Sequence, residues 1–250
     1  AQASLDLSGT EQGQAQQVTG RATQGKYITL PELDLCVMNP PFVRSVGGNL
    51  LFGSLPEDER GELRARLKKL VKDAKVQASV TSGLGSVFVA IGDKQIKQGG
   101  KIALVLPKAL LSGVSWNETR QLINAKYAID YLIVSHDAKR WNFSDSTDLS
   151  EALMIATNYG NADSTLTKKS RTVIVNLWRN PTTTLEALSV ASQIQLADPP
   201  DLLTGQGASS IILNGKKAGE IVLYPWQELK KDWFLPCAFA QSDLDRCAYS

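Results

Sequence analysis

The stretch Leu35-Cys36-Val37-Met38-Asn39-Pro40-Pro41-Phe42 decides the fold. Its four apolar residues are too few for a buried helix and stop at a double proline, so they predict a buried strand. Neither proline carries an N–H group, and each restricts the residue before it. The turn therefore offers carbonyl oxygens and the amide of Asn39, with few competing backbone donors. Such a turn, followed by the aromatic ring of Phe42, suits a planar ligand that carries an NH2 group.

A second strand follows the first through a helix. Ser86 to Lys97 has helical spacing of apolar residues, Gly99-Gly100 is expected to end that helix, and Lys101 to Leu106 is an apolar run stopped by Pro107. Helix, turn, strand and proline in this order predict a parallel α/β crossover unit. In an open parallel sheet, ligands bind beyond the carboxyl ends of the strands, which is where the Asn39 turn falls.

The rest of the chain continues the α/β pattern. We expect a helix that opens at Pro56, with acids in its first turn, and another over residues 116–125. Strands are predicted at 129–134 and 149–157, joined by a polar loop. From residue 171 the character changes, and a strand, a helix and a hairpin around Asn214-Gly215 are expected.

Composition and charge narrow the class of protein. The 250 residues are 43% hydrophobic and 21% charged, as in an ordinary globular protein, and a net charge of +2 is too small to prove a nucleic-acid partner. Cys36, Cys237 and Cys247 lack CxxC spacing and predict a reduced, cytoplasmic compartment. A single histidine, His136, cannot build a metal cluster, so no metal site is expected. No stretch reaches membrane-spanning length.

The Asn39 turn resembles the Asn-Pro-Pro-Tyr/Phe motif of amino-methyltransferases that use S-adenosylmethionine (AdoMet), above all the N6-adenine DNA methyltransferases. That resemblance implies a catalytic set of Asn39, Pro40, Pro41 and Phe42. Asn39 and the Pro40 carbonyl would accept hydrogen bonds from the exocyclic amine, and Phe42 would stack on an extruded base. It implies AdoMet as cofactor, DNA as partner, and restriction–modification or phage defence as the setting.

The resemblance extends to the next unit, where the helix, Gly99-Gly100 and the strand ending at Pro107 look like the continuation of the methyltransferase sheet. There it implies that Asn39, Phe88 and Pro107 contact the cofactor, with Phe88 against its adenine. The alternative for Phe88 is an ordinary place on the apolar face of a helix.

The loop between the strands at 129–134 and 149–157 resembles the loop of the terminal hairpin in that family. It implies that Phe143 packs against the base from the side opposite Phe42, and that Lys139 and Arg140 neutralise DNA phosphates. Alternatively, Phe143 anchors the loop in the core, and the two cations are exposed charges without a specific role.

Three segments are predicted: a loop or linker remnant at 1–30, the C-terminal half of a Rossmann-like AdoMet methyltransferase domain at 31–170, and the start of a second, target-recognition module at 171–250. A glycine-rich cofactor turn is expected well upstream of Asn39, and nothing before Leu35 resembles one. Either that turn lies on a missing N-terminal portion, or this chain is a degenerate relative that has lost it. Because the chain also begins at Ala1 and ends at Ser250 inside a polar segment, we expect a fragment that is inactive alone.

Other functions remain compatible with the same motif. Asn-Pro-Pro-aromatic also occurs in methyltransferases that act on a glutamine of release factors and on guanine N2 of ribosomal RNA. A different class of function is a catalytically inactive piece that binds nucleic acid. The long insert after Phe42 and the Phe143 loop favour DNA.

Overall fold

The structure is a computed structural model, and the chain divides into Ala1–Pro31 and Glu32–Ser250. The part of the chain that it describes comprises residues 31–42, 52–53, 55–73, 75–140, 142–143, 150–160, 170–197 and 208–248. The predicted linker remnant at 1–30 thus lies outside the described residues, and the fold described below is that of the second unit.

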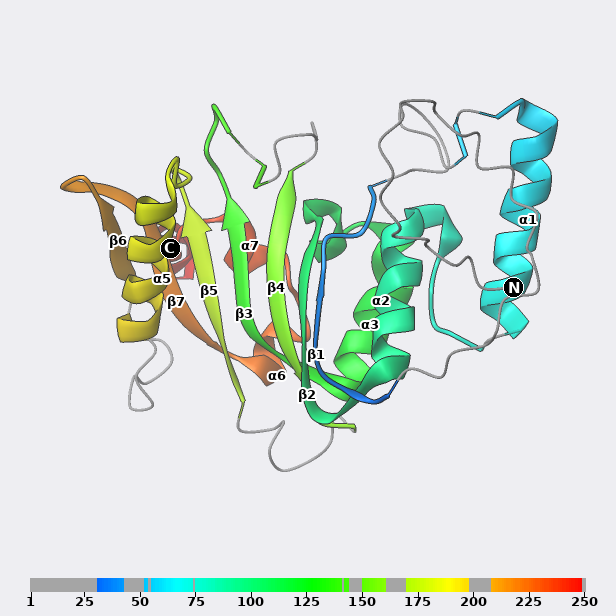
Figure 1. Cartoon of the computed structure of the whole chain (residues 1–250). Helices are drawn as coiled ribbons and strands as arrows, with labels where there is room; N and C mark the ends of the chain where they lie inside the picture. The colour runs from blue at the N-terminus through cyan, green and yellow to red at the C-terminus, as the bar shows by residue number, and fades with distance from the viewer. Residues whose placement is uncertain are drawn as a thin grey trace, which may run out of the picture. The chain divides into compact units, whose positions relative to one another are not determined.

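The second unit is built on one seven-stranded mixed sheet with the order β1-β2-β4-β3-β5-β7-β6. Its strands are β1 (Leu33–Met38), β2 (Ile96–Pro107), β3 (Tyr127–Ser135), β4 (Glu151–Asn158), β5 (Arg171–Leu177), β6 (Ser209–Leu213) and β7 (Lys216–Pro225). β1 and β2 are parallel, as are β3 and β5, while β4 and β7 run antiparallel to both of their neighbours (Figure 1). The predicted α/β class, with a Rossmann-like parallel crossover from β1 to β2, is confirmed.

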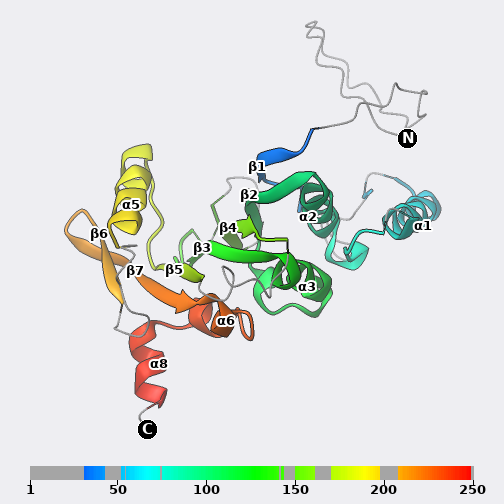
Figure 2. The ribbon, with the colours of Figure 1, turned by 90° about the horizontal axis from the view of Figure 1, so that it is seen from below.

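Helices lie on both faces of the sheet. The described helices are α1 (Glu57–Asp73), α2 (Leu84–Gln95), α3 (Asn117–Lys126), α5 (Thr184–Ala197), α6 (Trp226–Leu229), α7 (Leu235–Ala238) and α8 (Gln241–Ala248), with short 3-10 turns η1 (Val80–Ser82), η2 (Lys108–Leu111) and η3 (Val114–Trp116). Seen from below, α2, α3 and α6 lie on one side of the sheet and α5 on the other (Figure 2).

Each face has its own hydrophobic core. The larger core joins α2, α3 and α6 to the sheet and includes Leu104, Met154 and Trp226. The smaller core joins Val190 and Ile194 of α5 to the inward side chains of β5, β6 and β7. Because side chains alternate between the two faces of a strand, β3 and β5 contribute to both cores.

The prediction that the strand before Asn39 is buried is wrong. β1 is an edge strand, and the side chains of Leu35 and Val37 are 54% and 71% exposed. Cys36 and Met38 point the other way, toward α2, where a Cβ atom on Gly92 would lie 2.9 Å from Met38 Cε. The apolar run was read as a strand covered on both faces, whereas the described residues cover only one face of β1.

The predicted strands and helices are otherwise found at their expected places, with one shifted boundary. The helix before β2 ends at Gln95, and Gly99 and Gly100 lie inside β2. Gly99 has φ of +84°, and a Cβ atom on Gly100 would lie 2.9 Å from the carbonyl oxygen of Leu33. The glycine pair therefore allows β1 to approach β2 closely, at the point where their register shifts.

The strands after residue 170 belong to the same sheet as those before it. β5 pairs with β3, and β6 and β7 form the expected hairpin, in which Asn214 and Gly215 both have positive φ angles, 51° and 73°. The interpretation of 171–250 as the start of a target-recognition module stays a prediction. Among the described helices, none combines the length and apolar character needed to cross a membrane.

Candidate functional site

The predicted site residues gather at one edge of the sheet. β1 is parallel to β2, and β4 runs antiparallel to both β2 and β3, so β1, β2 and β3 all point the same way. Their carboxyl ends are Met38, Pro107 and Ser135. The Asn39 turn, Pro107 and the loop that starts at His136 therefore share this edge, which we call the carboxyl edge.

In the turn that follows β1 at the carboxyl edge, exposed and buried residues alternate. Asn39 and Pro41 are exposed, Pro40 is buried, and Phe42 is half-buried. A buried Pro40 between two exposed residues fixes the direction of the turn, since each proline also restricts the residue before it. The side chain of Asn39 is thus presented to solvent just beyond the end of a parallel strand, where ligands of open α/β sheets bind.

Phe143 follows β3, and the strand order separates it from Phe42. Two strands, β2 and β4, lie between β1 and β3, which at the usual spacing places β1 and β3 about 14 Å apart. Phe143 is half-buried and packs against the smaller core. This contact is the loop-anchor alternative of the sequence interpretation, and the stacking role of Phe143 opposite Phe42 stays a prediction.

Buried polar side chains hold the loop that carries Lys139, Arg140 and Phe143. Glu151, fully buried at the start of β4, accepts a hydrogen bond from the backbone N–H of Phe143 at 2.7 Å. Asn180, which is 3% exposed, donates its side-chain amide to the carbonyl oxygens of Arg140 at 2.6 Å and of Asn142 at 3.1 Å. The loop is thus tied to both β4 and the end of β5.

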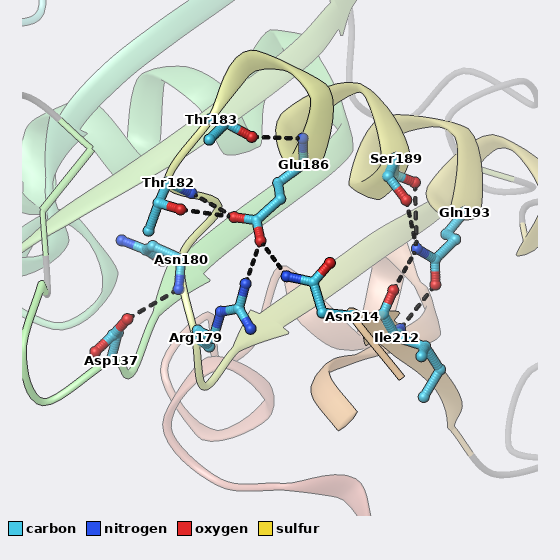
Figure 3. A network of polar contacts seen from close by, with 10 residues as sticks. All are labelled: Asp137, Arg179, Asn180, Thr182, Thr183, Glu186, Ser189, Gln193, Ile212 and Asn214. Carbon is cyan, nitrogen blue, oxygen red and sulfur yellow. Dashed lines mark hydrogen bonds and ion pairs between the residues drawn. The ribbon is translucent and has the colours of Figure 1, made fainter. Parts of the chain in front are cut away.

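Asp137 also holds this loop, through hydrogen bonds to backbone N–H groups. Its carboxylate accepts the backbone N–H of Asn180 at 3.0 Å and of Lys139 at 2.9 Å (Figure 3 shows the contact with Asn180). Burial raises the pKa of Asp137, but the backbone N–H groups of Asn180, Lys139 and Arg140 outweigh it and hold the pKa below its usual value. Lys139 is exposed and Arg140 half-buried, so the turn presents two cations beside the carboxyl edge.

Glu151, Asn180 and Asp137 were missed by the sequence interpretation. Glu151 did carry a signal, because a carboxylate in the apolar run 149–157 must find a donor if it is buried. Asn180 precedes Pro181, a typical turn pair, but nothing in the sequence indicates that it reaches a loop some forty residues earlier.

His136 lies at the same edge and faces the opposite side of the sheet from Phe143. Its Nε2 lies 3.2 Å from Asn176 Oδ1, and Asn176 Nδ2 donates to Glu220 Oε1 at 3.1 Å and to the carbonyl of Pro236 at 3.0 Å. Burial and the neighbouring Lys108 lower the pKa of His136. The chain of bonds ties α7 to β5 and β7, which is a structural role.

Lys108 and Cys237 lie near His136. Burial lowers the pKa of Lys108 and raises the pKa of the Cys237 thiol to about 12, so the thiol is protonated at neutral pH. A protonated buried thiol is not a nucleophile. Within the described residues, no group of three or more His, Cys, Asp or Glu side chains is placed to hold a metal ion.

The residues predicted to contact the cofactor lie at the ends of β1 and β2 and on α2. Asn39 directly follows β1, and Pro107 is the last residue of β2. These two strands are adjacent and parallel. Phe88 is 37% exposed on the side of α2 that points away from the sheet, beside Ile91, which is 51% exposed. Phe88 lies in the first half of α2. The assignment of Asn39, Phe88 and Pro107 to the cofactor stays a prediction.

Comparison with known proteins gives distant structural likenesses. No protein-family profile matches the chain, and no curated protein matches it. The M protein of the type I restriction enzyme EcoKI is similar with a TM-score of 0.38 and 16% identity, over 62% of this chain and 27% of that one. The type IIG restriction endonuclease BpuSI has a TM-score of 0.46 and 13% identity, over 79% and 20% of the two chains.

A protein of Listeria monocytogenes, described as a class I S-adenosylmethionine-dependent methyltransferase, has a TM-score of 0.39 and 13% identity, over 68% of this chain and 44% of that one. This chain therefore spans less than half of the length of each of these three solved chains, from 20% to 44%.

Proposed function

We propose that this chain is part of an enzyme that transfers a methyl group from AdoMet to the exocyclic N6 of adenine in DNA, in a restriction–modification or phage-defence system. One observation carries the proposal. The sequence Asn39-Pro40-Pro41-Phe42 lies directly beyond the carboxyl end of a parallel strand, with Asn39 exposed there. Motif and position agree, because that end of a parallel strand is where open α/β sheets bind their ligands.

Methyl transfer to adenine N6 requires hydrogen-bond acceptors at the amine. The lone pair of adenine N6 is delocalised into the ring, so the neutral amine is a poor nucleophile. Asn39 Oδ1 and the carbonyl of Pro40 would accept its two hydrogens and favour a nitrogen whose lone pair is available for attack. Positioning and local electrostatics then supply the rate, and no side chain forms a covalent bond.

An adenine inside a duplex cannot reach this turn, so the base must leave the stack. Phe42 would stack on one face of the extruded base. We propose Phe143 for the other face, because its loop leaves the same edge of the sheet and Glu151 and Asn180 fix the loop backbone. Lys139 and Arg140 would neutralise phosphates beside the flipped nucleotide.

The cofactor needs more protein than the described residues provide. AdoMet would supply the methyl group and would contact Asn39, Phe88 and Pro107, while nothing before Leu35 resembles the glycine-rich turn expected for its site. We therefore expect calorimetric titration of AdoMet into this chain to give little or no heat. Tight, stoichiometric binding would mean that residues 1–30 contain a cofactor site that the sequence interpretation overlooked.

Substrate class is tested on the full-length parent protein. Labelled AdoMet is supplied with DNA, with ribosomal RNA and with a release factor, and the product is digested and identified by mass spectrometry. The proposal expects label in DNA as N6-methyladenine. Label in RNA guanine or in a protein glutamine would replace it with one of the two alternative methyltransferases. Binding of DNA without any label would favour the inactive nucleic-acid-binding alternative.

A further inference from the structure

The outer side of α5 is apolar and exposed. Leu185, Leu188 and Leu196 are 79%, 59% and 81% exposed. Together with the exposed Ser192 they lie on one side of the helix, opposite Ile194, which packs into the smaller core. We call the four residues Leu185, Leu188, Ser192 and Leu196 the α5 stripe. Among the described helices and strands, none lies over this side of α5 (Figure 2).

The α5 stripe differs from the usual solvent-facing side of a helix, because it carries no charge. Glu186 is the only charged residue in α5, and its side chain is 13% exposed. The Glu186 carboxylate bonds to Arg179, Thr182 and Asn214 (Figure 3). Surface helices normally carry charged and polar residues on the side away from the core. Three exposed leucines on one uncharged side therefore indicate a contact surface.

Polar contacts fix α5 against the β6–β7 hairpin. Glu186 Oε1 accepts a hydrogen bond from Asn214 Nδ2 at 2.8 Å. Two helical turns later, Gln193 Nε2 donates to the carbonyl oxygen of Ile212 at 2.9 Å, and Gln193 Oε1 accepts the backbone N–H of Ile212 at 2.8 Å (Figure 3). The α5 stripe is thus held in place by the fold, and a preformed surface loses little conformational freedom when it binds a partner.

The Gln193 contact also bears on the neighbouring edge of the sheet. In the described part of the chain, β6 is the last strand on this side, and an edge strand is a template for pairing with another chain. Gln193 bonds both the N–H and the carbonyl of Ile212, as a partner strand would. Strand pairing at Ile212 would have to displace Gln193, whereas contact on the α5 stripe displaces no side chain. The helix is therefore the better contact surface.

The α5 stripe is complementary to itself. Leu188 and Leu196 lie four residues before and after Ser192, about 6 Å away along the helix in each direction. A two-fold axis at Ser192 therefore places Leu188 opposite Leu196 of a second, antiparallel α5. The small Ser192 lies at the crossing point, where it lets the two helices approach closely, and its hydroxyl can bond to the hydroxyl of the second Ser192. Two-fold pairs are the commonest form of protein oligomer.

We propose that the α5 stripe is the contact between two copies of this chain, whose α5 helices pack antiparallel across a two-fold axis at Ser192. Because the stripe is uncharged, like charges do not oppose each other across the axis, and nothing in it selects a partner of opposite charge. One helix pair is smaller than a standard interface, so we expect reversible association with a Kd of about 1–100 μM. The dimer does not rest on the proposed methyl transfer.

Self-association of the full-length parent protein tests the proposal. Sedimentation equilibrium from about 1 to 200 μM, without DNA or AdoMet, gives the Kd. Leu188→Glu would bury an unpaired carboxylate in the contact and should weaken the dimer by at least about 20-fold. Leu70→Glu is the matched control, because Leu70 is 62% exposed on α1 and should change the Kd by less than about 2-fold. Since both leucines are exposed, both variants should keep the melting temperature of the wild type.

Cysteine cross-linking locates the two-fold axis. In Ser192→Cys, the two introduced thiols would face each other at the crossing point, within the roughly 7 Å between Cα atoms that a disulfide allows. In Gln195→Cys, the two thiols would be separated by about 9 Å along the helices, which is too far. Both positions are exposed. Under mild oxidation, with the wild-type protein as the blank for its own thiols, we expect disulfide-linked dimer from Ser192→Cys and little from Gln195→Cys.

Three results would overturn the dimer. The first is a parent protein that stays monomeric up to about 200 μM, which would leave the α5 stripe to a different partner. The second is self-association that Leu188→Glu and Leu70→Glu change equally, which would place the contact elsewhere. The third is equal cross-linking of Ser192→Cys and Gln195→Cys, which would exclude an antiparallel pair centred on Ser192. Methyl transfer is measured separately, so none of these results bears on the proposed function.

Discussion

The carboxylate of Glu151 accepts a hydrogen bond from the backbone N–H of Phe143 at 2.7 Å. Glu151 begins β4 directly opposite Pro107, the last residue of β2, so one buried side chain connects two predicted site elements, the end of β2 and the Phe143 loop. Glu151 therefore connects the backbone at Phe143 to the sheet at the carboxyl edge.

Replacing Glu151 by Gln should loosen this loop. The charge-assisted bond becomes a neutral one, which weakens it by about 1.4 kcal/mol, so the amide hydrogen of Phe143 should exchange about tenfold faster. Hydrogen exchange followed by NMR measures it. The amide of Tyr159, bonded to the carbonyl of Lys126 at the other end of β4, serves as an internal control. Equal acceleration at both amides would mean that the sheet had been destabilised as a whole.

His136 should make the stability of the fold depend on pH. Burial and Lys108 lower its pKa below the ordinary value of 6.5, so between pH 7 and pH 5 the unfolded chain binds more protons than the folded chain. The free energy of unfolding should consequently fall as the pH falls through this window. Since the chain has one histidine, His136→Gln should flatten the profile of melting temperature against pH. An unchanged slope in the variant would contradict this account of His136.

Glycine at position 219 should be required for the pairing of β5 with β7. A Cβ atom there would lie 2.5 Å from the backbone oxygen of Asn176, which no side-chain rotation relieves. Gly219→Ala should lower the free energy of unfolding by about 3 kcal/mol. Gly61→Ala is the matched control, because nothing lies within 4 Å of its Cβ position, and in α1 it should stabilise by about 1 kcal/mol. Denaturant titration that shows equal effects would refute the prediction.

Glu186 should stabilise the start of α5 at neutral pH and lose this effect in acid. The backbone N–H and hydroxyl of Thr182, then Arg179, lower its pKa from 4.5 to about 2 (Figure 3). Glu186→Gln should lower the melting temperature at pH 7, and the difference should shrink between pH 4.5 and pH 2, as the carboxylate is protonated. Glu228→Gln, at a surface pair with Lys231, should have little effect at either pH.

The sequence was sufficient to predict the order of the helices and strands, and to predict that the ends of β1 and β2 lie at the same edge of the sheet. Apolar runs closed by proline, such as Leu35–Pro41 and Lys101–Pro107, predict strands by a local pattern, and parallel pairing then places their ends together. The Asn214-Gly215 turn was equally predictable, since both residues tolerate the positive φ that a tight hairpin requires.

Long-range contacts could not be predicted in this way. Nothing local to Leu35 or Val37 distinguishes a strand covered on both faces from an edge strand, because the pattern records only that the residues are apolar. Asn180 and Glu151 support the Phe143 loop through bonds between segments far apart in the chain. Phe88 was assigned to the cofactor by resemblance, and that assignment stays a prediction, while its exposure follows from which side of α2 packs on the sheet.

The central claim is that the Asn39 turn binds the amine that becomes methylated. The most direct measurement is the rate of methyl transfer to DNA by the full-length parent protein and its Asn39→Ala variant, beside Asn117→Ala, a control at an exposed asparagine. The account predicts that Asn39→Ala lowers kcat by at least about 100-fold and changes the Kd for DNA by less than about 2-fold, while Asn117→Ala retains full activity. Undiminished transfer by Asn39→Ala would contradict it.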